Sequence, residues 1–371
     1  MGQGHRNPCN EAQPILGLDG HKVLDAACGP FQSFLVTQNL RTGKQAVWHS
    51  GVAYWDDNTE SPFTTYTPTP RKVKKKTYLE KRKVRKIVPG PEHALFITEG
   101  ENLLYSCGSS GSFGTLGHGF TGLTEDKQTL GGPTLIPALK DTQILDVASG
   151  FAHVLALTEK QQVYAWGSNL HGECGVDSGS KAVTVPRRLA FFEDNKIRIK
   201  QLAAGQTHSL ALDEEGRVYS WGSHAEGKLG HDALAADLIA PRQLDFFTGG
   251  RKVRQLACGT DHSLAITESD EVYLWGFGQH GALSFVTEFK NAWTPTKLIA
   301  PVLQSREKTA AEKNFNLKSY PFLAEELQQA VAEGDFFSDM FVFKVVEAQC
   351  GMDMTVLKVA AELRPEVEAA L

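Results

Sequence analysis

Four histidines recur at one position of a repeated sequence, and they are the first candidates for chemistry in this chain. They are His93, His153, His208 and His262, and each follows a glycine by three residues. A set of histidines suggests a metal centre or a general base. Equivalent positions of a repeat protein lie on different repeats, however, so the four rings should not converge on one atom. We therefore expect each histidine to form a hydrogen bond within its own repeat unit and to stabilise the turn at its glycine.

The sequence GFGQHG over residues 276–281 is a second candidate, because it satisfies the GxGxxG pattern of dinucleotide-binding loops. That pattern indicates a nucleotide only when a helix follows it and an acidic ribose ligand stands further along the chain. The sibling segments GSNLHG and GSHAEG identify it instead as a loop of the repeat. We therefore predict no cofactor.

The six cysteines form no CxxC pair, so the sequence predicts no metal site either. Cys28, Cys258 and Cys350 occupy the same repeat position, directly before a glycine. Because they belong to different repeats, we expect them to lie too far apart to form disulfides. Small buried thiols of this kind are typical of a reducing compartment.

Composition limits the remaining classes of function. The chain has 371 residues, 41% apolar content and a net charge of −5, which does not favour binding of a polyanion by the whole protein. It contains no run of 18 apolar residues and no apolar core of a signal peptide near its first residue. We expect an intracellular protein, most simply cytoplasmic, with the nucleus or an organelle as alternatives.

Short strands must position all these residues, because the chain repeats one pattern six times. Each copy has an alternating apolar and polar run that ends at an anchor glycine, and three copies continue into VYAWG, VYSWG and VYLWG. The anchor glycines are Gly29, Gly90, Gly150, Gly205, Gly259 and Gly351, and the repeat tryptophans are Trp166, Trp221 and Trp275. We predict four antiparallel strands per copy, which is one blade of a β-propeller. A single blade cannot bury both faces, and this explains the repetition.

The segment GQTHSLALDEEGRVYSWGSHAEGKLG resembles the repeat of the regulator-of-chromosome-condensation-1 family. The resemblance covers about residues 2–301 and 341–359, and Gln32, Met354 and Cys107 depart from it at the histidine and tryptophan positions. It implies an all-β propeller, usually of seven four-stranded blades. Here we expect one domain over 1–371 with about six blades and a short helical tail at 360–371. The ring is open, completed by a partner, or the chain is incomplete.

The resemblance also suggests alternatives for function. The founding member of the family catalyses nucleotide exchange on a Ran-type GTPase, and the residues before the repeat histidine face that surface. In this chain the acidic residues at that position are Glu92, Asp261 and Asp353. Most relatives are interaction modules, however. We therefore expect a non-enzymatic interaction scaffold in a larger complex, with a guanine nucleotide exchange factor as the alternative and a chromatin or nucleic-acid binding propeller as the second alternative.

A basic insertion at 71–86 departs from the repeat. Its cations are Arg71, Lys72, Lys74, Lys75, Lys76, Lys81, Arg82, Lys83, Arg85 and Lys86. Such a run indicates an acidic protein partner, nucleic acid or a nuclear import signal, or simply a solvated basic loop. Tyr78 is its only aromatic residue, so base stacking has little support.

A second insertion at 303–340 lengthens the last repeat. The segment SYPFLAEELQQAVAEGD within it predicts a helix that begins near Pro321 and ends at Gly334. Its apolar stripe contains Phe322, Leu323, Leu327 and Val331. This stripe either packs on the propeller itself or binds a protein partner.

Overall fold

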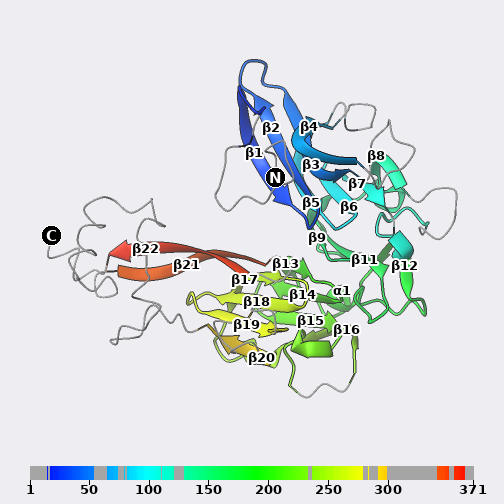
Figure 1. Cartoon of the computed structure of the whole chain (residues 1–371). Coiled ribbons are helices and arrows are strands. Elements are labelled where there is room, and N and C mark those ends of the chain that lie inside the picture. Colours follow the sequence, from blue (N-terminus) through cyan, green and yellow to red (C-terminus); the bar gives the residue numbers. More distant parts are fainter. Residues whose placement is uncertain are drawn as a thin grey trace.

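A computed structural model describes residues 15, 17–53, 65–73, 79, 82–109, 111–120, 129–232, 236–278, 283, 291–298, 341–350 and 355–363. These residues form mainly antiparallel strands, together with short helical turns (Figure 1). The all-β class expected from the repeats is therefore confirmed.

Five sheets of four strands follow one another along the chain, each in simple meander order. The first has strands β1 (His21–Cys28), β2 (Gln32–Asn39), β3 (Gln45–Ala53) and β4 (Thr65–Lys72). The second has β5 (Val84–Pro89), β6 (His93–Thr98), β7 (Leu104–Ser109) and β8 (Thr129–Leu135). The third has β9 (Ile144–Ser149), β10 (His153–Thr158), β11 (Val163–Ser168) and β12 (Ala182–Arg188).

The fourth sheet has β13 (Ile199–Ala204), β14 (His208–Asp213), β15 (Val218–Gly222) and β16 (Leu238–Gln243). The fifth has β17 (Val253–Cys258), β18 (His262–Thr267), β19 (Val272–Gly276) and β20 (Ala292–Lys297). A two-stranded sheet of β21 (Phe341–Cys350) and β22 (Thr355–Leu363) follows. The short helices are η2 (Gly111–Phe113), η3 (Pro137–Leu139), α1 (Phe191–Asp194), η4 (Ala225–Gly227) and η5 (Asp245–Phe247).

Each sheet is a propeller blade, and the anchor glycine lies in the loop between its first and second strands. The backbone N–H of Gly205 donates to the carbonyl of His208 at 2.9 Å, and equivalent bonds close this loop in every four-stranded blade. The second strand is fully buried in blades two to five. The third strand carries the repeat tryptophan, and Trp166, Trp221 and Trp275 are all completely buried.

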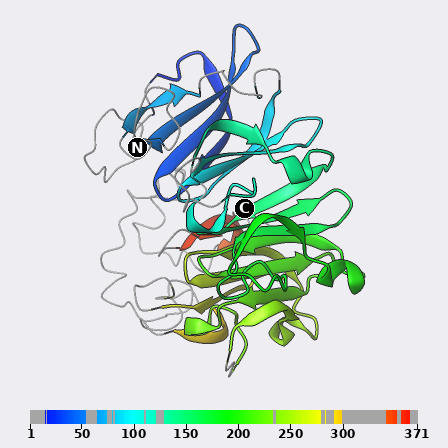
Figure 2. The same cartoon turned by 90° about the vertical axis from the view of Figure 1, so that its right-hand side faces the viewer.

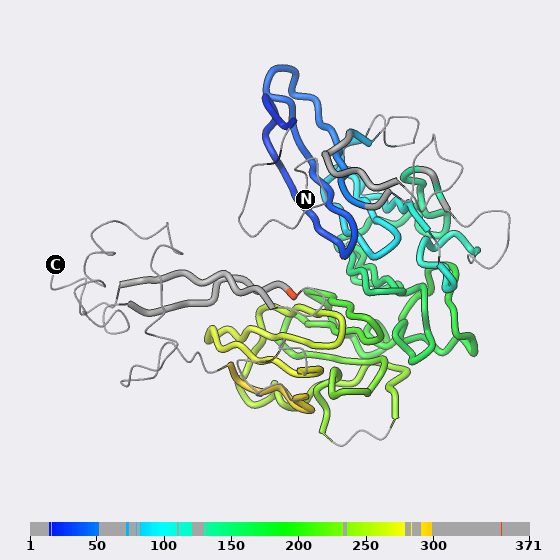
Figure 3. The backbone as a smooth tube through the Cα atoms, viewed as in Figure 1, coloured from blue at the N-terminus to red at the C-terminus, as the bar shows by residue number. Residues whose placement is uncertain are grey.

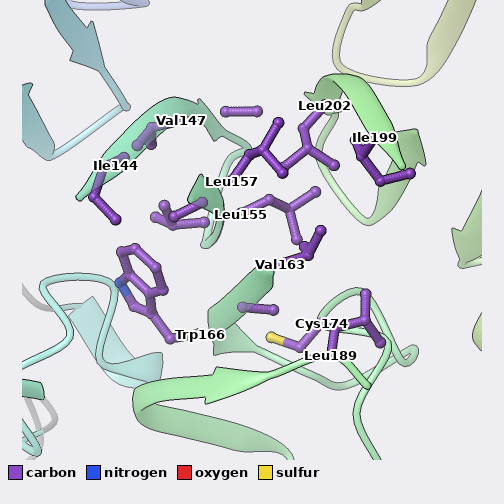
Figure 4. Packing of buried hydrophobic residues seen from close by; sticks show 14 of the residues in the cluster. Ile144, Val147, Leu155, Leu157, Val163, Trp166, Cys174, Leu189, Ile199 and Leu202 are labelled. Atoms are coloured by element: carbon purple, nitrogen blue, oxygen red, sulfur yellow. The ribbon is translucent and has the colours of Figure 1, made fainter. Parts of the chain in front are cut away.

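The blades are held together by apolar packing between the first strand of one blade and the preceding blade. Figure 4 shows Ile199 and Leu202 of β13 beside Leu155, Leu157 and Val163 of the third blade, with which they form one buried cluster. In the same way, β5 packs on β1 and β2, β17 packs on β13 and β14, and β21 packs on β17 and β18. Burial of these side chains, at about 1.5–3 kcal/mol each, stabilises the junctions between blades.

The blades follow one another from the first to the fifth (Figures 1 and 2), and β21–β22 lies beside the fifth blade (Figure 1). The sixth repeat is thus described as two strands, which agrees with the expectation of about six units. The helical insertion at 303–340 lies outside the described residues. Strand β22 extends to Leu363, so the expected helical tail does not begin at residue 360.

Candidate interaction surface

The anchor loops of the blades converge on a central cavity of about 290 Å³. Its lining includes Gly29, Gly90, Gly150, Gly205 and Gly259. A Cβ atom added to Gly150 would lie 2.4 Å from the carbonyl oxygen of Gly205 in the next blade. The anchor position therefore requires glycine because neighbouring blades meet there backbone against backbone.

The repeat histidines join neighbouring blades, which corrects the expectation that each bonds within its own blade. Nε2 of His153 lies 2.9 Å from Oγ of Ser209 in the fourth blade, and Nε2 of His208 lies 3.0 Å from Oγ of Ser263 in the fifth. Each ring also packs against the anchor glycine of its own blade, as predicted: Cε1 of His153 would lie 2.5 Å from a Cβ on Gly150. His153 and His208 thus link neighbouring blades.

The hydrogen bonds around Ser209 determine the proton on His153. Ser209 Oγ donates to the carbonyl of Glu173 at 2.8 Å, and Trp221 Nε1 donates to the same carbonyl at 2.8 Å. Because the serine hydroxyl uses its only hydrogen in the bond to the Glu173 carbonyl, Nε2 of His153 must carry a hydrogen and donate it to Ser209 Oγ. Burial lowers the pKa of His153 to about 4, and the nearby Glu173 carboxylate offsets only part of that effect. The ring is therefore neutral at pH 7.

The link persists where the repeat sequence departs from its pattern. In the third blade Val154 replaces the serine, and the Oγ of Ser149, its partner across the ladder, lies 2.9 Å from His93 Nε2 instead. In the first blade Gln32 replaces the histidine. Its Nε2 donates to the carbonyls of Gly90 and His93 in the second blade, both at 2.8 Å. The sequence departures thus preserve contact with the next blade.

Exposed side chains stand in the anchor loops, one residue before the repeat position in Phe31 and Glu92 and two residues before it in Phe151. Glu92 is exposed, and Phe31 and Phe151 retain 46% and 48% of their surface accessible to solvent. Phe151 also lines the cavity, as does Pro30 next to Phe31. We call these three residues, Phe31, Glu92 and Phe151, the mouth cluster. Two large apolar side chains that remain exposed suit contact with a protein better than contact with a small polar ligand.

Asp261 belongs to the same face but is already paired. Its Oδ1 accepts a hydrogen bond from Nζ of Lys228 at 2.5 Å, and Lys228 also donates to Thr207 Oγ1 at 3.2 Å. Only 5% of the Lys228 side chain is exposed, whereas 22% of the Asp261 side chain is. Glu226 Oε2 lies 3.5 Å from the same ammonium. The structure therefore places Asp261 in a bridge between the fourth and fifth blades.

A second polar cluster was not visible in the sequence. The carboxylate of Asp237 accepts Nδ1 of His171 and Nδ1 of His224, each at 2.7 Å, and so joins the third blade to the fourth. Burial raises the pKa of Asp237, but the hydrogen bonds from His224 and His171 outweigh this effect and leave the pKa below its ordinary value. Nothing in the repeat pattern singles out these three positions, because they stand in loops of variable sequence.

Among the described cations of the basic insertion, Arg85 and Lys86 join the second blade to the third, whereas Lys72, Arg82 and Lys83 form contacts within their own blades. Arg85 donates to the carbonyl of Leu145 at 2.9 Å, and Lys86 Nζ lies 2.5 Å from Asp146 Oδ1. Arg82 pairs with Glu101 at 2.8 Å. Lys72 lies 4.9 Å from the centre of the Trp48 ring. These contacts favour a structural contribution from part of the insertion, although exposed ion pairs of this kind are worth only about 0–1 kcal/mol.

Other predicted site residues fall outside the described part of the chain or outside its described side chains. They are Arg71, Lys74, Lys75, Lys76, Lys81, Phe322, Leu323, Leu327, Val331, Gly351 and Asp353.

Three cysteines at the anchor position, Cys28, Cys258 and Cys350, line the central cavity. All three are free thiols, in agreement with the expectation that they form no disulfides. Burial and the Cys350 thiol raise the pKa of Cys258 well above its ordinary value.

The described residues were also considered as a metal centre and as a membrane-spanning helix. No three His, Cys, Asp or Glu side chains there come together as ligands for a metal ion. No helix in this part of the chain has the length and apolar character needed to cross a membrane.

A family model described as "RCC1-like domain" matches residues 1–314. Among curated proteins, the ultraviolet-B receptor UVR8 of Arabidopsis thaliana is 33% identical over 205 residues, which is 55% of this chain and 44% of UVR8. The chain thus spans less than half the length of that relative.

Solved structures share the same architecture. Human WBSCR16 superposes with a TM-score of 0.69 at 22% identity, over 94% of this chain and 75% of that one. Prp20p of Saccharomyces cerevisiae, studied for its binding to Gsp1p and histones, gives 0.67 at 22% identity, over 95% of this chain and 72% of that one. At this level of identity the likeness establishes the fold.

Proposed function

The protein belongs to the family of RCC1-like domains, and from this membership we propose that it is a non-enzymatic interaction scaffold. In this role it is a propeller subunit that binds protein partners within a larger assembly. The proposal concerns the role of a surface, because a propeller fold by itself hosts many functions.

The mouth cluster is the observation that carries this proposal. Phe31 and Phe151 each leave nearly half of their surface in water, whereas the largest apolar side chains of the blades are buried. Aromatic residues are enriched at protein interfaces. By contrast, His153 and Lys228, whose side chains could take part in catalysis, are buried and form hydrogen bonds between blades. The face therefore offers contact area rather than a reactive group.

The two insertions extend the proposed binding surface. The basic insertion at 71–86 is next to the first and second blades, because Lys72 ends β4 and Val84 begins β5. The insertion at 303–340 precedes β21 and supplies the apolar stripe of its expected helix. In this proposal the insertions add selectivity for particular partners, while the mouth cluster supplies the common contact.

The test is capture of partners by the full chain from its native extract. The captured proteins are identified by mass spectrometry before and after a wash with GTP and magnesium, and the recovered partner is then purified. The double variant Phe31→Ser with Phe151→Asp should lose that partner and keep its melting temperature. Leu40→Ser is the matched control, because Leu40 is 71% exposed in the turn at the opposite end of β2. Equal binding by both variants would refute the role of the mouth cluster.

Exchange of guanine nucleotide on a small GTPase is a second candidate. The exposed Glu92 on the same face favours it, together with the similarity in fold to Prp20p, a protein studied for its binding to Gsp1p. An exchange factor should hold a nucleotide-free GTPase and release it when GTP is added. In that case Glu92→Ala should slow release of a labelled nucleotide from the GTPase. Partners retained unchanged through the GTP wash would exclude this candidate and leave the scaffold.

A further inference from the structure

The first strand of every four-stranded blade has a β-bulge at the same place. Its pairing with the second strand skips one residue, five positions before the anchor glycine. Figure 3 traces the chain through these blades in order. The bulged residues are Leu24, Arg85, Leu145, Lys200 and Arg254. A bulge leaves the extra residue unpaired and redirects its side chain, here by the same geometry in each blade.

The bulges lie along the inner edge of the blades. The first strand is an edge strand of each sheet, and the anchor glycine that follows it lines the central cavity. First strands of neighbouring blades pack side by side. At about 3.3 Å per residue, the bulge lies about 16 Å along the strand from the anchor loop. The bulges therefore form a surface separate from the mouth cluster.

Three consecutive blades, the second to the fourth, carry exposed side chains at the bulge. They are Arg85, Leu145 and Lys200, which we call the bulge cluster. Leu145 leaves 41% of its surface in water, although the adjacent Ile144 is completely buried. Nη2 of Arg85 donates to the carbonyl of Leu145 at 2.9 Å, so the bulges of neighbouring blades are in contact. In blade order the cluster thus presents an apolar side chain between two cations.

The charges of these two cations are not neutralised by the carboxylates around them. Asp146, next to Leu145, accepts Nζ of Lys86 at 2.5 Å. The glutamates whose backbone N–H groups bond to the start of these strands have partners as well: Glu99 pairs with Lys83, Glu214 pairs with Arg198, and Glu159 accepts a hydrogen bond from Asn102. Lys200 forms no ion pair with any residue that the structure describes. Arg85 bonds to two carbonyl groups, which leave its charge uncompensated.

We propose that the bulge cluster binds an acidic segment of a partner protein, in which an apolar side chain stands between two carboxylates. The apolar side chain packs on Leu145, and the carboxylates pair with Arg85 and Lys200. The bonds of Arg85 to the third blade use only Nη2, so other N–H groups of the guanidinium remain to bind a carboxylate. Nucleic acid would satisfy the two cations but not the exposed leucine, and the observations therefore favour a peptide.

The test measures binding of a fluorescein-labelled peptide of sequence EELEE to the full chain by fluorescence anisotropy. The peptide EEGEE lacks the apolar side chain, and the peptide KKLKK reverses the charge. Both should bind about tenfold more weakly than EELEE or less well still. The affinity for EELEE should also fall as the salt concentration rises.

Two variants of the chain locate the site. Lys200→Glu should weaken binding of EELEE by about tenfold, because it replaces an attractive charge with a repulsive one. Lys181→Glu is the matched control, since Lys181 is an exposed lysine just before the outer strand β12 and the change in net charge is the same. It should leave the affinity within about twofold. Both variants should keep the melting temperature. Leu145→Ser should abolish the preference for EELEE over EEGEE.

Three results would overturn the proposal. The first is no binding of EELEE to the unaltered chain at peptide concentrations up to about 1 mM. The second is equal affinity of Lys200→Glu and Lys181→Glu for this peptide. The third is a short single-stranded DNA that displaces the peptide and binds more tightly, which would make nucleic acid the occupant. None of these results bears on the mouth cluster, whose test uses other variants.

Discussion

The replacement Ser209→Ala tests the hydrogen-bonded link between the third and fourth blades. Ser209 is completely buried, and its hydroxyl accepts from Nε2 of His153 at 2.9 Å and donates to the carbonyl of Glu173 at 2.8 Å. Alanine removes both bonds with little change in volume. The Glu173 carbonyl keeps the bond from Trp221, but His153 loses its partner on Nε2, and its Nδ1 has none among the described residues.

The expected cost follows from these two losses. A buried donor without an acceptor costs about 1–3 kcal/mol, and a lost neutral hydrogen bond costs about 0.5–1.5 kcal/mol. Because Trp221 still satisfies the Glu173 carbonyl, the second loss falls at the lower end of its range. We therefore expect the free energy of unfolding to fall by about 1.5–3.5 kcal/mol, most of it from the His153 ring.

Urea denaturation followed by tryptophan fluorescence measures this change, provided that the slope with denaturant is the same in all variants. Ser263→Ala repeats the perturbation at the next junction, where His208 and Lys228 occupy the roles of His153 and Glu173. Ser180→Ala is the control, because Ser180 is exposed, and it should cost less than about 0.5 kcal/mol.

One further variant keeps a hydrogen-bond donor at position 153 but removes the imidazole ring. His153→Gln places in the third blade the residue that the first blade uses, where Gln32 reaches two carbonyls of the next blade. It should destabilise the protein less than His153→Ala. If Ser209→Ala costs no more than Ser180→Ala, the assignment of the proton to Nε2 and the link between blades are both refuted.

Three other predictions follow from the same structure. The free energy of unfolding should fall as the pH drops from about 6.5 to about 4, because His153 takes up a proton at a higher pH in the unfolded chain than in the folded protein. This residue alone accounts for about 3 kcal/mol. A dependence of stability on pH that is equally steep in His153→Gln would contradict this prediction. Gly150→Ala should lower the free energy of unfolding by about 3 kcal/mol, because the added Cβ would meet the backbone of the next blade. Gly100→Ala should lower it by only about 1 kcal/mol, because Gly100 has open space around it and only its positive φ is unfavourable for alanine. Thermal unfolding of the two variants measures the difference. Asp261→Ala leaves Lys228 buried without its main partner and should cost about 2–4 kcal/mol, while Glu92→Ala should stay within about 0.5 kcal/mol by denaturant titration.

The blades were predictable because each unit has strong local signals. The alternation that ends at Gly205 fits β13, the HSLAL segment fits β14, and the polar turn DEEGR separates β14 from β15. These features depend on residues within one unit, so a single sequence contains them. The end of the chain was less predictable, since AAEL favours a helix by intrinsic propensity but the pairing of β21 with β22 extends the strand to Leu363.

The contacts between blades were not predictable, because they depend on how far each unit is rotated relative to the next. The histidine position was identified correctly, but the partner of His153 is Ser209, 56 residues away in the next blade. The serine that follows the histidine in the fourth and fifth blades was the sequence feature that could have indicated this partner. In the third blade Val154 stands at that position, and Ser149 on the paired strand contacts His93 instead.

Two acidic residues at one repeat position differ in their contacts. Glu92 and Asp261 share one repeat position, and the sequence assigned them the same role. Their environments differ in the structure, because the carboxylate of Asp261 is paired with Lys228 whereas Glu92 is exposed to solvent. A loss of binding in Asp261→Ala would therefore report on stability as much as on the surface, and Glu92→Ala is the better test.

Lys228 explains why function is difficult to recognise in such a repeat. Its equivalents in the second and third blades are Thr115 and Glu173, and in all three the backbone carbonyl accepts the repeat tryptophan of the next blade. Because the backbone carbonyl makes this contact, the side chain at that position differs from blade to blade. All three side chains are nevertheless buried, and each forms its own hydrogen bonds: Thr115 with Ser109, Glu173 with Ser168, and Lys228 with Asp261. Variation of the repeat at this position therefore follows the packing of each junction and does not by itself mark residues that bind a partner.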